Sequence, residues 1–333
     1  MLPLMKALLR FRRRPCARAV LAVVLIATSG LSHLSAATHP AARLLGRWDL
    51  TVRDNATSYP SWLEVRLSGN RTLVGTYVAR FGSARPVSQI DFDPATGAFK
   101  FVVPPQWEKH NQSITVEGRL EGDGLAGQTI NDQGAQVSWT GRHAPALDRE
   151  RQPKWGKPIK LFNGRDLSGW KPRDPVRPNG WRVSGGHLTN AAPGNDLVSE
   201  QSFDDFKLRA VFRYPKASNS GIYLRGRYEV QIEDNFGLPP DSHYIGGVYG
   251  HLTPRVNTAR PAGEWQTMDI TLVGRVVTIL LNGEPIIERQ VIPGITGGAL
   301  DSAEDRPGPL LIQGDHGPVE FKELTLTPTL GEN

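Results

Sequence analysis

Short runs in which apolar and polar residues alternate fill most of the chain after residue 43. Runs such as SWLEVRLSG (61–69) and GAFKFVVP (97–104) repeat with a period of two, and Gly, Asn, Asp or Pro separates each run from the next. A period of two indicates a half-buried β-strand, because successive side chains point to opposite faces of a sheet. No long segment with the helical period stands out. The pattern therefore predicts an all-β protein with many tight turns.

The runs form two groups with a stretch of no periodicity between them. Residues 44–145 hold about seven short runs, which is typical of a small antiparallel β-barrel or sandwich. Residues 146–158, ALDRERQPKWGKP, are charged and contain Pro, and we interpret them as a linker. Residues 159–329 hold longer runs that need two sheets to bury their apolar faces, so this group predicts a β-sandwich. Two tight turns are predicted inside it, at Gly274-Arg275 and at Asn282-Gly283.

The N-terminus has the composition of an export signal. Basic residues precede the apolar run AVLAVVLIA (19–27), and the small-residue segment SHLSAAT follows it. The run is shorter than the roughly 20 residues of a spanning helix, so we predict a signal peptide over residues 1–37. The mature protein would then be periplasmic or secreted, with no integral membrane span; an uncleaved anchor is the alternative. Cys16, the only cysteine, would leave with the signal, which excludes disulfides and thiolate metal sites from the mature chain.

The positive charge of the chain is concentrated in that signal. The formal net charge is +6, and six basic residues precede the apolar run, so 6 − 6 leaves the remainder near neutrality. The high pI of about 9.5 is therefore no argument for a nucleic-acid partner, and we expect none. The sequence does not indicate an oligomeric state. The six basic residues are Lys6, Arg10, Arg12, Arg13, Arg14 and Arg18.

One segment of the second group, SNSGIYLRGRYEVQIEDN (218–235), carries more charge than a core strand needs. Strand alternation turns Val230 and Ile232 to one face, and it turns three polar side chains to the other. Just upstream, Tyr223 and Arg225 alternate with aliphatic residues and extend this polar row. From this segment alone, a solvated outer face and a binding site both remain open. The three polar side chains are Glu229, Gln231 and Glu233.

Two further segments favour a site. The loop GLPPDSHYIGGVYGHLTPRVN (237–257) lacks a core pattern and is rich in Gly, Pro, His and Tyr, among them Tyr249. Loops of this composition often form the walls of binding sites, although a flexible surface loop is the alternative. Later, the apolar run LLI is followed within four residues by Gln313, Asp315 and His316. Three polar groups directly after an apolar strand are difficult to explain by packing alone.

Seven segments in this order resemble the 3-keto-disaccharide hydrolase family, formerly domain of unknown function 1080. They are LFNGRDLSGW (161–170), NSGIYLRGRYEVQIEDN (219–235), GGVYG (246–250), AGEWQTMDI (262–270), LNG (281–283), IQGDHG (312–317) and VEFKEL (319–324). The resemblance covers about 170 residues and leaves the first group unassigned. It implies a concanavalin A-like jelly roll, similar to laminarinase-type glycoside hydrolases, in which YEVQIED crosses the concave, sugar-binding face.

The resemblance also implies chemistry. In laminarinase-like relatives, acids at alternate strand positions act on the glycosidic bond, and Glu229 and Glu233 would take those parts here. Gln231 stands between them, which favours another route: removal of the acidic C2 proton of a 3-keto-sugar, β-elimination of the group at C1, and hydration. Glu229, Glu233 and His316 are then the candidate acids, bases or metal ligands, for Ca²⁺, Mg²⁺, Mn²⁺ or Zn²⁺. The candidates for binding the oligosaccharide or glycoside are Arg225, Gln231, Tyr249 and Gln313.

Two other functions remain open at this stage. Sandwiches of this kind also bind sugars without cleaving them, so a carbohydrate-binding or periplasmic interaction protein is one alternative. A conventional two-carboxylate glycoside hydrolase is the other, with its carboxyl groups about 5–5.5 Å apart for retention or wider for inversion. The acids kept on the polar strand face favour catalysis over binding alone.

Overall fold

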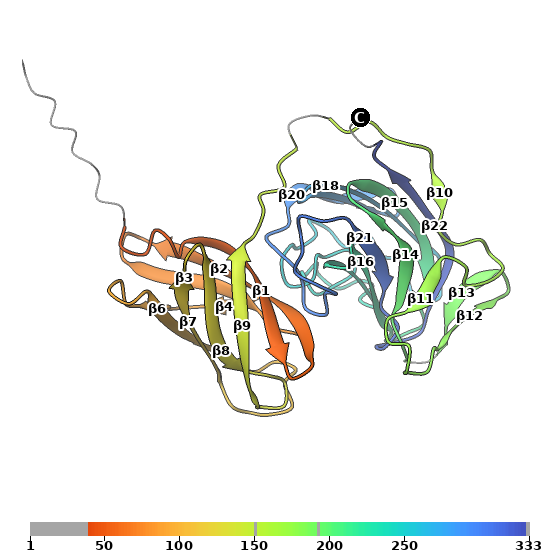
Figure 1. Ribbon diagram of the computed structural model, residues 1–333. Coiled ribbons are helices and arrows are strands. Elements are labelled where there is room, and N and C mark those ends of the chain that lie inside the picture. Colours follow the sequence, from red (N-terminus) through yellow and green to blue (C-terminus); the bar gives the residue numbers. More distant parts are fainter. Residues whose placement is uncertain (1–38, 150–151, 192–193, 331–333) are drawn as a thin grey trace, which may run out of the picture. The chain divides into compact units, whose positions relative to one another are not determined.

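The structure is a computed structural model that describes residues 39–149, 152–191 and 194–330, and strands make up its regular structure (Figure 1). In these described ranges there is no α-helix, and hence no helix able to cross a membrane. The all-β prediction is confirmed. The predicted signal peptide lies outside the described residues.

The first nine strands form one antiparallel sheet that curls into a half-barrel. Its order is β4-β3-β2-β1-β9-β8-β7-β6-β5. Seven of these strands follow the alternating runs, whereas β4 and β5 are too short for a period to appear in the sequence. The strands are β1 (Gly46–Asp54), β2 (Thr57–Ser68), β3 (Thr72–Val78), β4 (Arg85–Val87), β5 (Asp91–Phe92), β6 (Ala98–Val103), β7 (Ile114–Glu121), β8 (Gly124–Ile130) and β9 (Gln136–His143).

Aromatic residues of this sheet pack on two sides of it. Trp48, Phe101 and Trp139 belong to the apolar cluster inside the half-barrel. Trp62 on β2 belongs instead to the cluster that fills the sandwich, and it is completely buried there. Its indole lies against the backbone of Gly294, where an added Cβ would come within 2.2 Å of the ring. The apolar core of the sandwich therefore extends to a strand of the first sheet.

The remaining strands form a two-sheet sandwich. The larger sheet has the order β12-β13-β22-β15-β18-β19-β20, with β10 paired to β22, and the smaller has the order β11-β14-β21-β16-β17. The strands are β10 (Ile159–Lys160), β11 (Trp170–Pro172), β12 (Trp181–Ser184), β13 (His187–Asn190), β14 (Leu197–Phe203), β15 (Phe206–Arg213), β16 (Asn219–Leu224), β17 (Tyr228–Glu233), β18 (Gln266–Val273), β19 (Val276–Leu281), β20 (Glu284–Val291), β21 (Gly308–Ile312) and β22 (Val319–Pro328).

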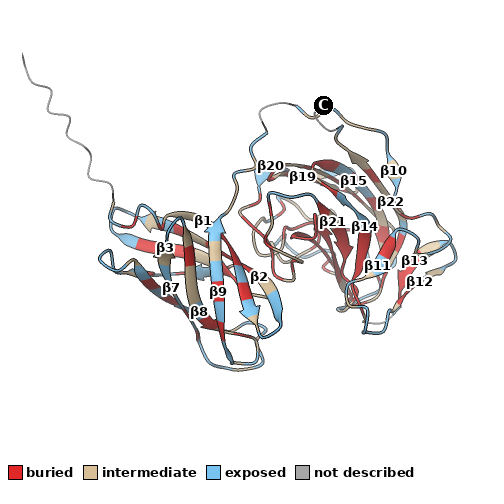
Figure 2. Cartoon of the chain, in the orientation of Figure 1, coloured by how far each residue is buried: buried red, intermediate tan, exposed pale blue. Residues whose placement is uncertain are grey.

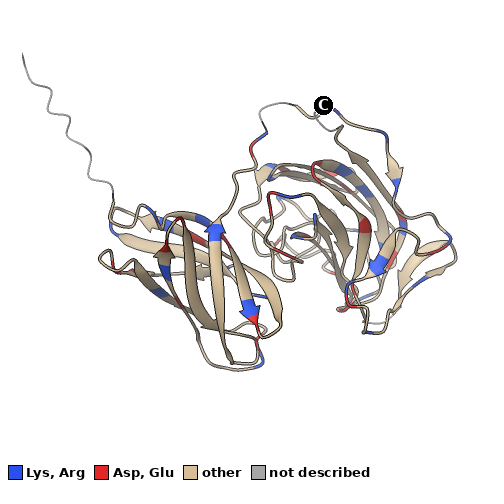
Figure 3. Cartoon of the chain, in the orientation of Figure 1, with Lys and Arg blue, Asp and Glu red and all other residues tan. Residues whose placement is uncertain are grey.

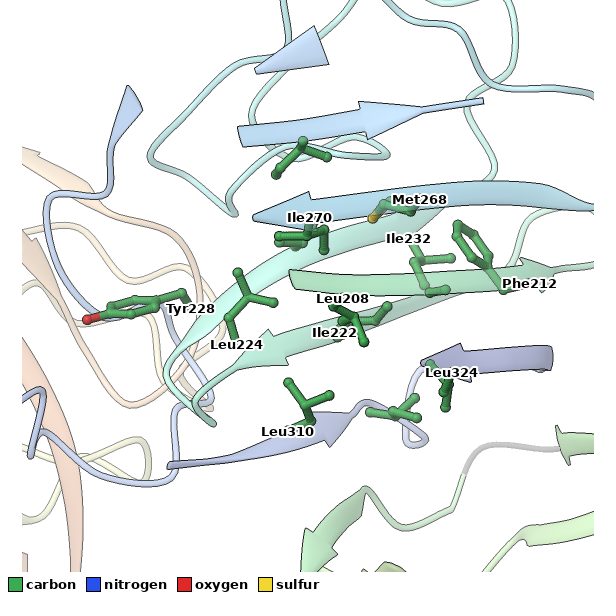
Figure 4. Packing of buried hydrophobic residues seen from close by; sticks show 14 of the residues in the cluster. Leu208, Phe212, Ile222, Leu224, Tyr228, Ile232, Met268, Ile270, Leu310 and Leu324 are labelled. Atoms are coloured by element: carbon green, nitrogen blue, oxygen red, sulfur yellow. The ribbon is translucent and has the colours of Figure 1, made fainter. Parts of the chain in front are cut away.

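Side chains from the two sheets interdigitate to form the core. Ile222, Leu224 and Ile232 of the smaller sheet face Leu208 and Ile270 of the larger sheet (Figure 4). Buried positions cover most of β14 and β21 (Figure 2). The larger sheet alternates buried and partly exposed residues, and basic and acidic residues are interspersed on its outer face (Figure 3). This one-sided burial is the normal state of an antiparallel sheet.

The sandwich differs from the sequence prediction in several places, two of which affect the face that carries the polar strand residues. The segment 221–233, which the alternation treats as one strand, is a hairpin: Arg225 and Gly226 both have positive φ, 53° and 67°, and the chain reverses there. Strand β14 was not predicted, because its residues LVSEQSF lack a steady alternation. The predicted turns at Gly274-Arg275 and Asn282-Gly283 are confirmed, and they join β18 to β19 and β19 to β20.

Candidate functional site

The β16–β17 hairpin places its polar side chains on the face of the smaller sheet that points away from the core. Tyr223 pairs with Glu229 and Gly221 with Gln231, while Val230 enters the core. This face is not solvated, since Glu229 is only 4% exposed and Gln231 only 2%. A carboxyl and an amide buried on the far side of a sheet indicate a built site rather than an outer surface.

The Glu229 carboxyl lies against Gly221, which has no side chain and so leaves room for it. A Cβ at Gly221 on β16 would lie 2.4 Å from Glu229 Oε1, so a side chain at this position would displace the carboxyl. The Tyr223 hydroxyl lies 3.0 Å from Oε2 and also 3.0 Å from the carbonyl oxygen of Gly297. Tyr223 holds a single hydroxyl proton, which it can donate to only one of these two acceptors at a time.

Burial raises the pKa of Glu229 to about 8. The hydrogen bond from Tyr223 and the positive charge of His316 act in the opposite direction, and the carboxylates of Asp196 and Asp315 add to the increase. Desolvation is the largest cause because the ionised form loses its water here. A carboxyl in this state exchanges its proton near neutral pH, as general acid–base catalysis requires.

An imidazole–carboxylate pair stands near Glu229, just beyond β21. His316 Nδ1 lies 2.5 Å from Asp315 Oδ1, and this hydrogen bond is the main reason that the pKa of His316 is raised. Glu229 and Asp196 raise it further. Asp196 is itself held by Arg173 at 3.0 Å and by the backbone N–H of Gly314 at 3.0 Å. The acids around His316 therefore favour its cationic form.

Two buried glutamines contribute polar atoms with no partner. Gln231 and Gln313 are 2% and 9% exposed, and among the described residues no group hydrogen-bonds to the side-chain oxygen of either. The strands hold both residues in place: the backbone N–H of Gln313 donates to Gly221 O at 2.9 Å. A buried oxygen without a partner is costly, and a hydroxyl-rich ligand would satisfy it.

The loop after β17 folds back along the free edge of that strand. Gln231 N–H donates to Gly247 O at 2.9 Å, and Tyr249 N–H donates to Glu229 O at 3.0 Å. Tyr249 is thereby fixed beside the acids: burial raises the pKa of its hydroxyl, and the charges of Glu229 and Glu233 add to this effect. Burial also raises the pKa of Glu233, which is partly exposed at the end of β17.

Arg225 is not brought to this group. The hairpin turn directs it away from Glu229, so that its fully buried guanidinium bonds Asp204 at 3.1 Å and the carbonyl of Gly274, over the Tyr228 ring. The predicted row assumed an unbroken strand, and the turn at Arg225-Gly226 ends that row. Its position supports a structural role for Arg225 and no contact with a sugar.

The candidate metal ligands do not form a cage. In the described parts of the chain, no three His, Cys, Asp or Glu side chains come together as a metal-binding group. Glu229 and His316 lie in one electrostatic cluster, whereas the charges that act on Glu233 are those of His243, Asp234 and Asp241.

The sequence did not identify several residues of the site. Gly221 and Asp196 were not predicted, and Tyr223 and Asp315 were noted without a role. The only signal for Gly221 is its position opposite Gln231 in a hairpin that the sequence had not resolved. Asp196 precedes β14, the strand that alternation did not reveal.

Comparisons with known proteins agree with this architecture. The profile of the 3-keto-alpha-glucoside-1,2-lyase-like domain matches residues 157–327. A 3-keto-disaccharide hydrolase from Bacteroides thetaiotaomicron is 23% identical over 166 residues, which cover 39% of this chain, and the chain spans 57% of that relative's length.

Two solved structures are similar to about half of this chain. One, from Parabacteroides distasonis, carries a provisional assignment as a glycosyl hydrolase; it is 25% identical, with 54% of this chain and 92% of that chain covered and a TM-score of 0.43. A carbohydrate-binding module from Bacillus subtilis is 13% identical, with 47% and 94% covered and a TM-score of 0.32.

Proposed function

Because this chain belongs to the family of the 3-keto-alpha-glucoside-1,2-lyase-like domain, we propose that it is an enzyme that cleaves the glycosidic bond of 3-keto-glycosides. The observation that carries the proposal is the Glu229 carboxyl, which is buried over Gly221, has a pKa raised to about 8 and lies in the field of His316. Perturbed acids in a polar, enclosed site are typical of acid–base catalysis.

Glu229 acts as the base in the first step. Its carboxylate removes the C2 proton, which the C3 ketone acidifies, and the electron pair of the C–H bond becomes the C1–C2 double bond as the C1–O bond breaks. His316, protonated through its pairing with Asp315, gives its proton to the leaving oxygen. A base of raised pKa holds the abstracted proton more strongly than an ordinary carboxylate does, which favours this transfer.

Hydration reverses the proton movements. The proton on Glu229 exchanges with solvent, and Glu229 then delivers a solvent-derived proton to C2, while His316 takes a proton from water and the hydroxide adds to C1. The sum is hydrolysis of the glycosidic bond with both side chains restored. Sugar hydroxyls would donate hydrogen bonds to the unpartnered side-chain oxygens of Gln231 and Gln313, and also to Tyr249 and Glu233.

The test is turnover in D₂O. We expect the purified protein to cleave 3-keto-trehalose and to leave deuterium at C2 of the product, beyond the exchange in a control without enzyme. Direct two-carboxylate hydrolysis would leave C2 protonated. Glu229→Gln should remove both turnover and C2 exchange, whereas Glu233→Gln should mainly raise KM. Parallel reactions with a chelator test the predicted divalent metal.

Each outcome has a defined meaning. If no 3-keto-glycoside is turned over, the enzymatic proposal is wrong, and a sugar-binding function becomes the better explanation. If turnover survives Glu229→Gln with C2 exchange intact, the reaction class stands and the assignment of Glu229 is wrong.

A further inference from the structure

One aromatic side chain of the nine-stranded sheet reaches the edge of the site. Trp107, in the loop between β6 and β7, is 67% exposed, which is unusual for the largest apolar side chain. The Trp107 side chain lies near enough to Tyr249 to oppose the increase that burial causes in the pKa of the Tyr249 hydroxyl, which also lies in the field of Glu229 and Glu233. Trp107 therefore stands next to the tyrosine that borders the acids.

The loop that carries Trp107 is held in place by buried charge. The Glu108 carboxylate accepts hydrogen bonds from the backbone N–H groups of Gln106 at 2.6 Å and Trp107 at 3.2 Å. It pairs with Arg85 at 3.0 Å, and both side chains are nearly fully buried. Gln106 and Ser83 exchange two more hydrogen bonds, of 3.0 and 3.1 Å. An exposed ring on such an anchored loop loses little entropy on binding a ligand.

The neighbouring segment of the same sheet packs closely on the loops of the site. Added Cβ atoms at Gly250 and Gly297 would lie 2.5 Å from Ser83 and 2.2 Å from Gly82 O. Gly297 O is one of the two acceptors of the Tyr223 hydroxyl, whose other acceptor is Glu229. A Cβ on Gly82 would also meet the Trp107 ring at 2.8 Å. Backbone contacts therefore connect the position of Trp107 to the site.

We propose that Trp107 is the stacking platform for the second, non-reacting sugar ring of a two-ring substrate. This inference rests on the proposed function, because the reacting ring must hold its C2 at Glu229. Glu229 interacts with Tyr223 and His316, whereas Trp107 borders Tyr249, so we assign a ring on the indole as the neighbouring ring. The C–H face of a hexopyranose is apolar and matches a flat, exposed indole, and aromatic walls are common in ligand sites. Trp107 lies outside residues 157–327, so the family match does not include this subsite.

The experiment compares two substrates on the full chain. Steady-state kinetics are measured with 3-keto-trehalose, which has two rings, and with methyl 3-keto-glucoside, which has one. We expect Trp107→Ala to raise KM for the two-ring substrate about tenfold, which is the upper end of the affinity that one aromatic contact contributes. The KM for the methyl glycoside should change less than about twofold. Trp107→Phe should retain most of the affinity. Val102→Ala removes another exposed apolar side chain of the same sheet and serves as the matched control.

The outcomes separate this proposal from the proposed function. Equal effects of Trp107→Ala on both substrates, or no effect on either, would overturn the stacking role. If the intact protein turns over neither substrate, the proposed function fails. The role of Trp107 is then tested by calorimetry, which measures the affinity for 3-keto-trehalose. Binding by the intact protein that weakens about tenfold in Trp107→Ala supports the platform. Equal affinities of the two proteins, or no binding by the intact protein, overturn it.

Discussion

Replacing Glu229 by Gln should stabilise the fold while it removes the proposed activity. The pKa of this carboxyl is about 8 in the folded protein against an ordinary value of 4.5. The folded state therefore keeps a proton that the unfolded state releases, and stability falls as pH rises from 4.5 to 8. At pH 7 the cost is at most about 3.5 kcal/mol, from about 1.4 kcal/mol for each of the 2.5 pH units between 4.5 and 7.

Glutamine keeps the shape and the acceptor for Tyr223 but does not titrate, so it escapes this cost. Denaturant unfolding of the intact protein and of Glu229→Gln across pH 4.5–8 measures the difference directly. We expect the two free energies of unfolding to converge near pH 4.5 and to separate by up to about 1.4 kcal/mol per pH unit above it. Titration of groups that do not interact with Glu229, such as Asp49 with its pKa raised to about 9, cancels in the difference.

A difference that stays constant across this range would refute the reasoning, because it would mean that Glu229 ionises normally in the folded protein. Glu233→Gln is the matched control. Burial raises the pKa of Glu233 too, but this carboxyl is half-buried, so its variant should show the same sign with a smaller slope.

Three further predictions follow from the structure. Gly221→Ala should reduce kcat more than a hundredfold, because its Cβ would take the space of Glu229 Oε1, and a crystal structure of the variant with an unmoved carboxyl would contradict this. Asp315→Asn should remove the main cause of the raised His316 pKa, so the alkaline limb of the pH–rate profile should move to lower pH; an unchanged limb would exclude His316 as the proton donor. N-terminal sequencing of protein from its native host should begin after Ala37, and a chain that still begins with Met1 would rule out the predicted cleavage.

The sequence predicted the class of fold because strand alternation is a local property. Each run records its own buried face, and Asn282-Gly283 has the chemistry of a tight turn, so strands and turns in the larger sheet were found directly. Alternation does not reveal a turn that interrupts a run of alternating residues. Arg225 looked like a continuation of the polar row until the positive φ of two consecutive residues turned the chain.

The site was predictable only where it lies on one strand. Glu229 and Gln231 follow from the period of β17. The space for the Glu229 carboxyl depends on Gly221 across the hairpin, and its partner Tyr223 contacts Gly297 and Gly298, which are distant in sequence. The pKa of Glu229 depends on burial and on Asp196 and Asp315 from two other strand ends. Such quantities belong to the assembled sheet, and no single segment contains them. The catalytic roles stay predictions.

The position of Trp62 has a consequence for dissecting this protein. The family match begins at residue 157, yet the apolar cluster of the sandwich includes Trp62 and Val78 from the preceding sheet. A fragment cut at that boundary would open a gap of the size of an indole beside Gly294, and losing a buried Trp costs roughly 3–5 kcal/mol. A stable protein therefore requires both β regions, and not only the residues that the family match covers. We expect the two regions to unfold in one transition.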